Sequence, residues 1–247
     1  MFELRPLPYA EPAYGYPESG QTLINVTNGK LIRLLVDDAP FDVRYGTLYS
    51  NERVLDLQAG VLTRQARWCS PSGSANQATI HAAGVVHAAR VAAICFEVEP
   101  VEQPVKLVVQ SELVANESLP DLRGDPRTAA ALESPLMAEE STTTDIGAVM
   151  VHRTRASKLL VAAAMRHEVQ TQGRMRRFTD SADDVCRFTV AAALEPGQRL
   201  RLVKYLAYGW SSQRSRPAGA GPGAGRARCS LPDWLERPGR RAAGLPR

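Results

Sequence analysis

The stretch Val61-Leu-Thr-Arg-Gln-Ala-Arg-Trp68 indicates the fold class, because its side chains alternate in character along the chain. Leu62, Ala66 and Trp68 fall on one side, with Arg64 as the exception, and polar side chains fall on the other. Successive side chains of a strand point to opposite faces of a sheet, so a period of two indicates a half-buried β-strand. We expect one face of this strand to line a hydrophobic core.

Similar short segments flank this strand and are separated by Gly- and Pro-rich turns. The predicted strands are residues 23–27, 30–36, 47–57, 61–68, 77–82, 85–98, 105–112, 148–153, 158–165, 185–194 and 199–208. About ten strands at this spacing, with no long amphipathic helix, predict an all-β fold, an antiparallel β-sandwich or barrel. Residues 115–146 interrupt the pattern and are predicted to form a long loop with one short helical turn.

Asn28-Gly29 lies between two of the predicted strands, 23–27 and 30–36. This dipeptide favours a type I′ turn, which needs positive φ at both central residues. The sequence therefore predicts a two-residue hairpin at this point.

The composition is that of an ordinary globular domain. The chain has 247 residues, of which 44% are hydrophobic and 23% are charged. It shows neither an apolar run of about 18 residues, as in a membrane helix, nor a secretory signal at its N-terminus. We expect a soluble, cytoplasmic protein that does not bind membranes.

The net charge of +4 is unevenly distributed. Residues 216–247 contain seven Arg, one Asp and one Glu, so the rest of the chain is close to neutral and nucleic-acid binding is not expected. This tail is rich in Arg, Gly, Ala and Pro, which predicts an unstructured segment after a domain at 1–215. It is either a flexible arm or the product of out-of-frame translation of a GC-rich gene, and we favour the second.

No catalytic, cofactor or metal site can be argued from motifs. The chain lacks dinucleotide and phosphate-loop motifs, and its four cysteines are isolated, as expected for mostly buried, reduced thiols. No nucleophile motif accompanies the four histidines, which are His81, His87, His152 and His167. The acidic pairs are Asp37-Asp38, Glu139-Glu140 and Asp183-Asp184, and we interpret them as solvated acids in turns or loops.

One group of aromatic residues is a candidate sugar-binding site, because sugars stack on aromatic faces beside carboxylates and arginines. Its members are Tyr9, Tyr14, Tyr16, Tyr45, Tyr49 and Trp68. Packing in the core and in turns explains the same residues equally simply, and we favour that interpretation.

Several stretches taken together resemble one family. They include Phe2-Glu-Leu-Arg-Pro-Leu-Pro-Tyr-Ala-Glu, Asn25-Val-Thr-Asn-Gly-Lys, Arg53-Val-Leu-Asp-Leu-Gln-Ala-Gly-Val-Leu-Thr-Arg, Trp68-Cys-Ser-Pro-Ser-Gly and Gln110-Ser-Glu-Leu-Val-Ala-Asn-Glu. Over residues 2–215 the chain resembles the N-terminal domain of glycoside hydrolase family 65, the family of maltose, trehalose and kojibiose phosphorylases and related α-glucoside hydrolases. Residues 75–89 depart from the family pattern.

The resemblance implies a galactose-mutarotase-like β super-sandwich, here incomplete at its N-terminus. In the family this domain precedes a helical linker and an (α/α)₆ barrel, which carries the general acid and the phosphate-binding residues, and members are often homodimers. No position of this chain matches a catalytic residue, so we expect it to be inactive alone towards maltose, trehalose or kojibiose.

Two functions remain open. The first is a non-catalytic N-terminal domain fragment of an α-glucoside phosphorylase or hydrolase, which would meet its carbohydrate together with the barrel. The alternative is a free-standing carbohydrate-binding module, or a partner subunit of a separately encoded barrel.

Overall fold

The computed structural model describes residues 1–6, 14–15, 19–71, 77–88, 91–117 and 132–211, and these residues form strands and their connections without a helix. The strands are β1 (Phe2–Pro6), β2 (Ser19–Leu23), β3 (Ile32–Val36), β4 (Ala39–Pro40), β5 (Thr47–Asp56), β6 (Val61–Cys69), β7 (Gln77–Ala88), β8 (Val91–Pro100), β9 (Val105–Val114), β10 (Leu136–Thr144), β11 (Gly147–Thr154), β12 (Leu160–Thr171), β13 (Arg174–Ser181), β14 (Val185–Leu194) and β15 (Leu200–Ser211).

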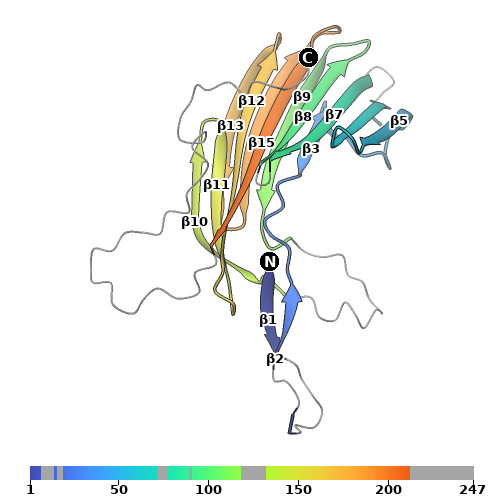
Figure 1. Cartoon of the computed structure of the whole chain (residues 1–247). Coiled ribbons are helices and arrows are strands. Elements are labelled where there is room, and N and C mark those ends of the chain that lie inside the picture. Colours follow the sequence, from blue (N-terminus) through green and yellow to red (C-terminus); the bar gives the residue numbers. More distant parts are fainter. Residues whose placement is uncertain (7–13, 16–18, 72–76, 89–90, 118–131, 212–247) are drawn as a thin grey trace.

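Two antiparallel sheets of unequal width pack face to face (Figure 1). The large sheet has the order β10-β11-β12-β15-β8-β7-β6-β5, and the small sheet has the order β13-β14-β9-β3-β4. The hairpin β1-β2 projects from one end of the sandwich (Figure 1). The predicted all-β super-sandwich is confirmed. No helix in the described part of the chain is long and apolar enough to span a membrane.

The core lies between the two sheets and follows the period of two. In β9 and β14 the buried side chains recur at alternate positions, among them Val109, Phe188 and Val190. On β6, Ala66 and Trp68 are buried, as predicted from the sequence, while Leu62 on the same face is 43% exposed. This difference reflects the unequal width of the sheets.

The predicted hairpin at Asn28-Gly29 is wrong. Asn28 instead forms a bridge with Val114, with hydrogen bonds of 2.7 and 3.0 Å between their backbone groups. Gly29 does not have positive φ. A Cβ there would lie 2.7 Å from Leu206 Cδ2 and 2.8 Å from Tyr208 Oη, so this glycine permits close packing rather than a turn.

The two-residue hairpin of this region lies at Asp37-Asp38, between the paired residues Val36 and Ala39. Both aspartates have positive φ, of 46° and 68°, as a type I′ turn requires. Asp37 is held in place because its carboxylate accepts a 2.8 Å hydrogen bond from the Lys106 backbone N–H.

Other differences concern strand limits. β7 runs on to Ala88, so the predicted break near residues 83–84 is wrong. The predicted loop 115–146 contains β10, and β12 continues to Thr171. The predicted helical turn falls mainly within 118–131, and the predicted tail lies in 212–247; both ranges lie outside the described residues.

Candidate functional site

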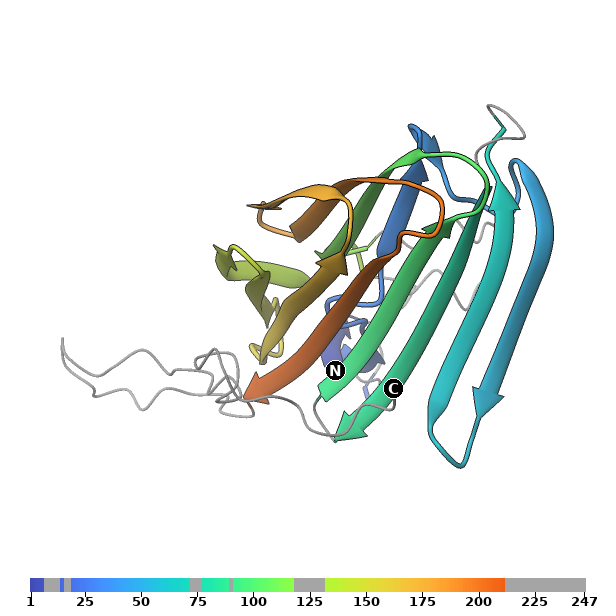
Figure 2. The same cartoon turned by 90° about the horizontal axis from the view of Figure 1, so that it is seen from above.

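The large sheet extends beyond the small one at its β5 end. Strands of the two sheets lie over one another in order: β10 packs on β13, β11 on β14 and β12 on β9. The small sheet then ends at β4. Figure 2 shows β5 and β6 at the outer end of the large sheet, past the small sheet. We call the surface formed by residues 41–57 and 61–68 the open edge.

The inward face of the open edge carries apolar side chains that nothing in the described part of the chain covers. One row of paired residues crosses the sheet from strand to strand. In this row Leu55 is paired with Leu62, Leu62 with Gly84, Gly84 with Ile94, and Ile94 with Lys204. Because Lys204 Nζ reaches backbone carbonyls of the small sheet, this whole row points inward. Leu55 is nevertheless 59% exposed and Leu62 43% exposed, so the described chain leaves this apolar part of the inward face largely uncovered.

Three of the six predicted aromatic residues come together at the open edge. Trp68 is buried, its Nε1 donates a 2.7 Å hydrogen bond to Tyr45 O, and Phe41 meets its ring edge-on at 5.4 Å. Tyr45 and Tyr49 are 61% and 52% exposed. Tyr14 is also exposed but belongs to the connection between β1 and β2, and Tyr9 and Tyr16 lie outside the described residues.

Arginines cover one ring face of each aromatic residue around Trp68. Arg44 lies 5.7 Å from the Tyr45 ring centroid and Arg67 lies 5.6 Å from that of Tyr49. Arg64 lies 5.6 Å from the ring of Phe41. Such cation–π contacts leave less of each ring available for a sugar to stack on.

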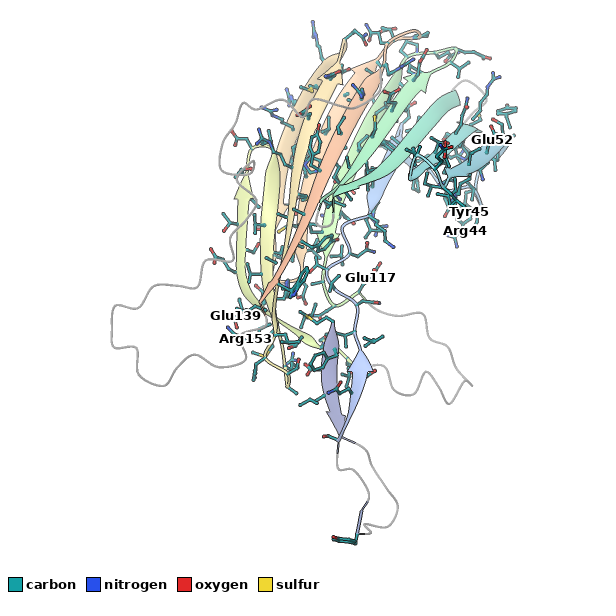
Figure 3. All side chains as sticks on the ribbon, viewed as in Figure 1. Arg44, Tyr45, Glu52, Glu117, Glu139 and Arg153 are labelled. Carbon is teal, nitrogen blue, oxygen red and sulfur yellow. The ribbon has the colours of Figure 1, made fainter. Side chains whose placement is uncertain are left out.

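The charges at this edge are fixed by local pairs. The Arg44 guanidinium hydrogen-bonds to Asp42 at 2.6 Å and lowers the pKa of that carboxyl to about 2. Burial, followed by the neighbouring Arg53, lowers the pKa of Arg64, whose Nε donates to Asn51 Oδ1 at 3.1 Å. Figure 3 places Arg44, Tyr45 and Glu52 together at the β5 end, far from Glu139 and Arg153.

His167 contacts a hydroxyl but is buried inside the sandwich. Its Nε2 lies 2.8 Å from Ser111 Oγ, its Nδ1 lies 3.0 Å from Ile146 O, and its ring stacks on Phe188 at 4.2 Å. Burial and then the nearby Lys204 lower the pKa of His167 to about 3. A neutral, enclosed imidazole without access for a substrate supports the core and is not a catalytic base.

The remaining predicted polar residues form no shared site. His152 is buried, with its Nε2 3.1 Å from Asp184 Oδ1 in the turn before β14. Asp37-Asp38 and Asp183-Asp184 lie in turns, as predicted. Glu139-Glu140, however, lies on the strand β10, and the side chains of His81 and His87 are outside the described part.

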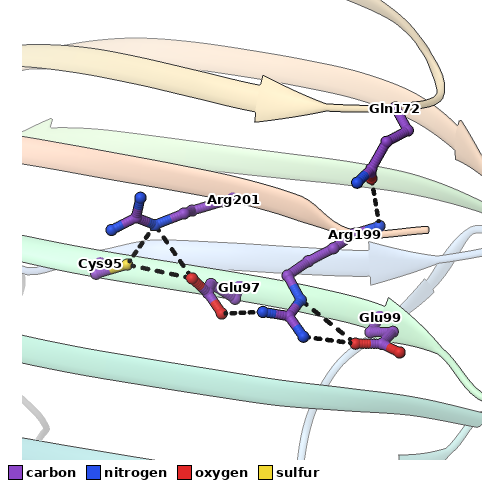
Figure 4. A network of polar contacts seen from close by, with 6 residues as sticks. All are labelled: Cys95, Glu97, Glu99, Gln172, Arg199 and Arg201. Carbon is purple, nitrogen blue, oxygen red and sulfur yellow. Dashed lines mark hydrogen bonds and ion pairs between the residues drawn. The ribbon is translucent and has the colours of Figure 1, made fainter. Parts of the chain in front are cut away.

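The outer face of the large sheet carries a solvated ion network (Figure 4). Arg199 pairs with Glu97 and Glu99 at 3.2 and 3.1 Å, and Arg201 pairs with Glu97 at 3.1 Å beside Cys95. Ion pairs exposed to solvent in this way contribute little to the stability of the folded state. The two cysteines flanking this one along the chain, Cys69 and Cys186, are buried free thiols, as expected from the sequence.

Comparison with known proteins identifies this architecture. The model of the glycosyl hydrolase family 65 N-terminal domain matches residues 1–234. The chain belongs to this family. Its match extends past residue 215, into the segment that composition alone assigns to the tail.

Relatives and solved structures agree with the family. The chain is 56% identical over 220 residues to an "Uncharacterized glycosyl hydrolase" of Mycobacterium tuberculosis (strain ATCC 25618 / H37Rv), covering 88% of this chain and 28% of the relative. It is 26% identical over 209 residues to the alpha,alpha-trehalose phosphorylase of Thermoanaerobacter brockii, covering 84% of this chain and 27% of that protein. The chain thus spans little more than a quarter of the curated relatives it matches.

The fold also occurs in a "Putative kojibiose phosphorylase from human microbiome". The superposition has a TM-score of 0.72 at 14% identity, over 87% of this chain and 26% of that structure. In each of these cases the matched part is only about a quarter of a longer protein.

The sequence did not single out the arginines and Phe41 of the open edge. Arg64 stood out only as an exception to the alternation of β6, and that irregularity was the available signal. Its inward position is explained by the absence of the small sheet opposite it.

Proposed function

We propose that this chain acts as the non-catalytic N-terminal domain of an α-glucoside phosphorylase or hydrolase. The observation that carries the proposal is the 56% identity over 220 residues to a relative of which the chain covers only 28%. The acidic pairs of the described part lie in turns or on an edge strand. The pocket between β10 and β13 is lined by one acidic residue, Asp145, whereas glycosidases use two carboxylates.

The open edge is proposed to dock onto the rest of such an enzyme. Its exposed tyrosines and arginines are of the kinds enriched at the centres of protein interfaces, and its exposed leucines add apolar area that a partner would bury. Within the described chain, β5 pairs only with β6. Its other backbone edge is therefore available to a docking partner. Covering Leu55 and Leu62 would complete the core that the small sheet leaves open.

A free-standing sugar-binding module at this edge is less well supported. Trp68 is enclosed, and arginines cover one face of Tyr45 and of Tyr49. Free thiols at Cys69 and Cys186 suit a cytoplasmic location, which we propose for the working domain.

Co-expression with the remainder of the M. tuberculosis relative tests the docking. We expect the two polypeptides to co-elute in size-exclusion chromatography. The double change Leu55→Asp and Leu62→Asp should abolish the complex, because it places two charges in an interface that excludes water.

The matched control is Phe178→Asp, which replaces a large exposed apolar side chain of the small sheet, far from the open edge, by a charged one. It should leave the complex intact. If the double variant still co-elutes, the interface lies elsewhere on the domain. If the unmodified chain forms no complex, the docking proposal is wrong.

A further inference from the structure

Two arginines lie directly opposite each other on the inward face of the open edge. Arg53 of β5 is paired with Arg64 of β6. The same row of paired residues crosses β7 and reaches Phe96 and Leu202, which are both buried in the core. Because the side chains of one such row point to the same face of a sheet, both arginines point inward.

The contacts of Arg64 place this pair at the point where the small sheet ends. Its Nε donates a 3.1 Å hydrogen bond to Asn51 Oδ1, and its guanidinium lies 5.6 Å from the centroid of the Phe41 ring. Phe41 directly follows β4, and its backbone N–H donates a 2.8 Å hydrogen bond to Leu34 O of β3. Arg64 therefore lies beside the last strands of the small sheet, and Arg53 lies one strand further out.

This pair of cations has no counter-charge in the described part of the chain. Neither arginine forms an ion pair there, and the Arg53 side chain makes no hydrogen bond. Burial and then the charge of Arg53 lower the pKa of Arg64. Among the nearby carboxylates, Glu52 alternates to the opposite face of β5, and Asp42 is paired with Arg44. Like charges directly opposite each other on two strands are destabilising, so the free domain gains nothing from this arrangement.

Docking at the open edge would remove the pair from water. Leu55 and Leu62 form the next row on the same face of the same two strands, and both are partly exposed. A partner that buries these leucines also encloses the arginines beside them. Enclosing two cations without a counter-charge is strongly unfavourable, so a partner that fits this surface must bring a negative charge to the pair.

A protein carboxylate meets both requirements of this surface. Guanidinium groups only donate hydrogen bonds, and they bind the two oxygens of a carboxylate in a geometry that matches their own. A free anion such as phosphate would neutralise the arginines but would leave Leu55 and Leu62 exposed. An aspartate or glutamate within an apolar protein surface neutralises the pair and covers the leucines together.

We propose that Arg53 and Arg64 receive an aspartate or glutamate side chain that the docking partner presents within an apolar surface. The inference rests on the docking proposed above and adds to it the chemistry of the partner. The arginine pair repels itself in the free domain and becomes a specific contact in the complex. It therefore fixes the position of the partner on the open edge, as buried charge pairs do at other interfaces.

Isothermal titration calorimetry of the full 247-residue chain with the remainder of the M. tuberculosis relative tests the pair. Arg53→Met and Arg64→Met keep long side chains without the charge. Each should weaken binding at least about tenfold, because the carboxylate of the partner then stays enclosed with too few donors. The control is Arg176→Met, which removes an exposed arginine on β13, at the far end of the small sheet, and should bind like the unmodified chain.

A charge scan of the partner locates the carboxylate. Its aspartates are changed to asparagine and its glutamates to glutamine, one at a time. We expect one change to weaken binding to the unmodified chain about tenfold and to have little further effect on the Arg53→Met variant, as residues in contact show in a double-mutant cycle. A scan in which no change is coupled to Arg53 would contradict the proposal.

Unfolding of the free chain separates a binding role from a structural one. Arg53→Met should leave the unfolding midpoint unchanged or raise it by about 1–2 °C, because it removes a like-charge pair between two strands. A fall in the midpoint would show that Arg53 supports the fold of the domain itself, and the proposal would be wrong.

Two further results would overturn the proposal while leaving the docking intact or open to test. Equal affinities of the unmodified chain and both arginine variants would show that the complex forms without a carboxylate at the pair. A rise in the unfolding midpoint with millimolar phosphate that Arg53→Met abolishes would show a site for a small anion. Absence of any complex with the unmodified chain would instead reject the docking, and with it the partner named here.

Discussion

Lys204 is the largest charged side chain enclosed in the core. Its Nζ donates hydrogen bonds to Glu112 O at 2.8 Å and to Leu31 O at 3.3 Å, and so ties the large sheet to the small one. Burial lowers its pKa from 10.5 to about 7, opposed by the Glu112 carboxylate. The folded protein therefore loses this proton at a lower pH than the unfolded chain does.

This difference predicts a pH-dependent stability. Between pH 7 and 10.5 the unfolded chain binds more protons at this site, so the free energy of unfolding should rise with pH, by at most about 1.4 kcal/mol per pH unit. Urea unfolding at pH 7 and 8.5 measures the slope. Lys204→Met, which keeps a long side chain without a titratable group, should flatten it; an equal slope in both proteins would contradict the prediction.

Single residues were predictable from the sequence where their role is local. The burial of Trp68 follows from the alternation of its own strand. The role of Gly29 does not, because the side chains that would collide with a Cβ belong to Leu206 and Tyr208, nearly 180 residues further along the chain. A turn-like dipeptide carries no information about such contacts.

Among the elements, strands with one buried face were found, and so was the exposed edge strand β5, whereas the edge strands β10 and β13 were missed. β14 was predicted at its observed limits because its burial alternates. β10 and β13 are mostly exposed, and their polar sequences lack a period of two. They are strands because each pairs with a neighbour, which no local pattern records.

The β3-β4 turn offers a stabilising substitution. Asp38 has φ of 68°, a conformation that glycine adopts without steric cost, and its side chain makes no hydrogen bond in the described chain. Asp38→Gly should raise the free energy of unfolding by about 0.5 kcal/mol, measured by thermal or urea unfolding. Asp37→Gly is the contrast, because it also removes the 2.8 Å bond to Lys106 N and should not stabilise.

At the scale of the whole molecule, the unequal width of the two sheets creates the open edge, which we propose as the docking surface. The sequence predicted the sandwich, and the resemblance to family 65 predicted its partnership with a longer enzyme. Neither predicted where the open edge lies, because it arises from strand order, in which β5 ends the large sheet beyond the small one.

The last prediction concerns residues 216–247. This segment has few large apolar side chains, namely Leu231, Trp234, Leu235 and Leu245, so composition predicts that it adds little to stability. Deleting it should shift the unfolding midpoint by less than the roughly 2–4 °C that corresponds to 1 kcal/mol in a domain of this size. Because the family match reaches residue 234, a second deletion of 235–247 is the control. A fall of several degrees in the first variant but not in the second would show that residues 216–234 pack on the sandwich, and the domain would then end at 234 and not at 215.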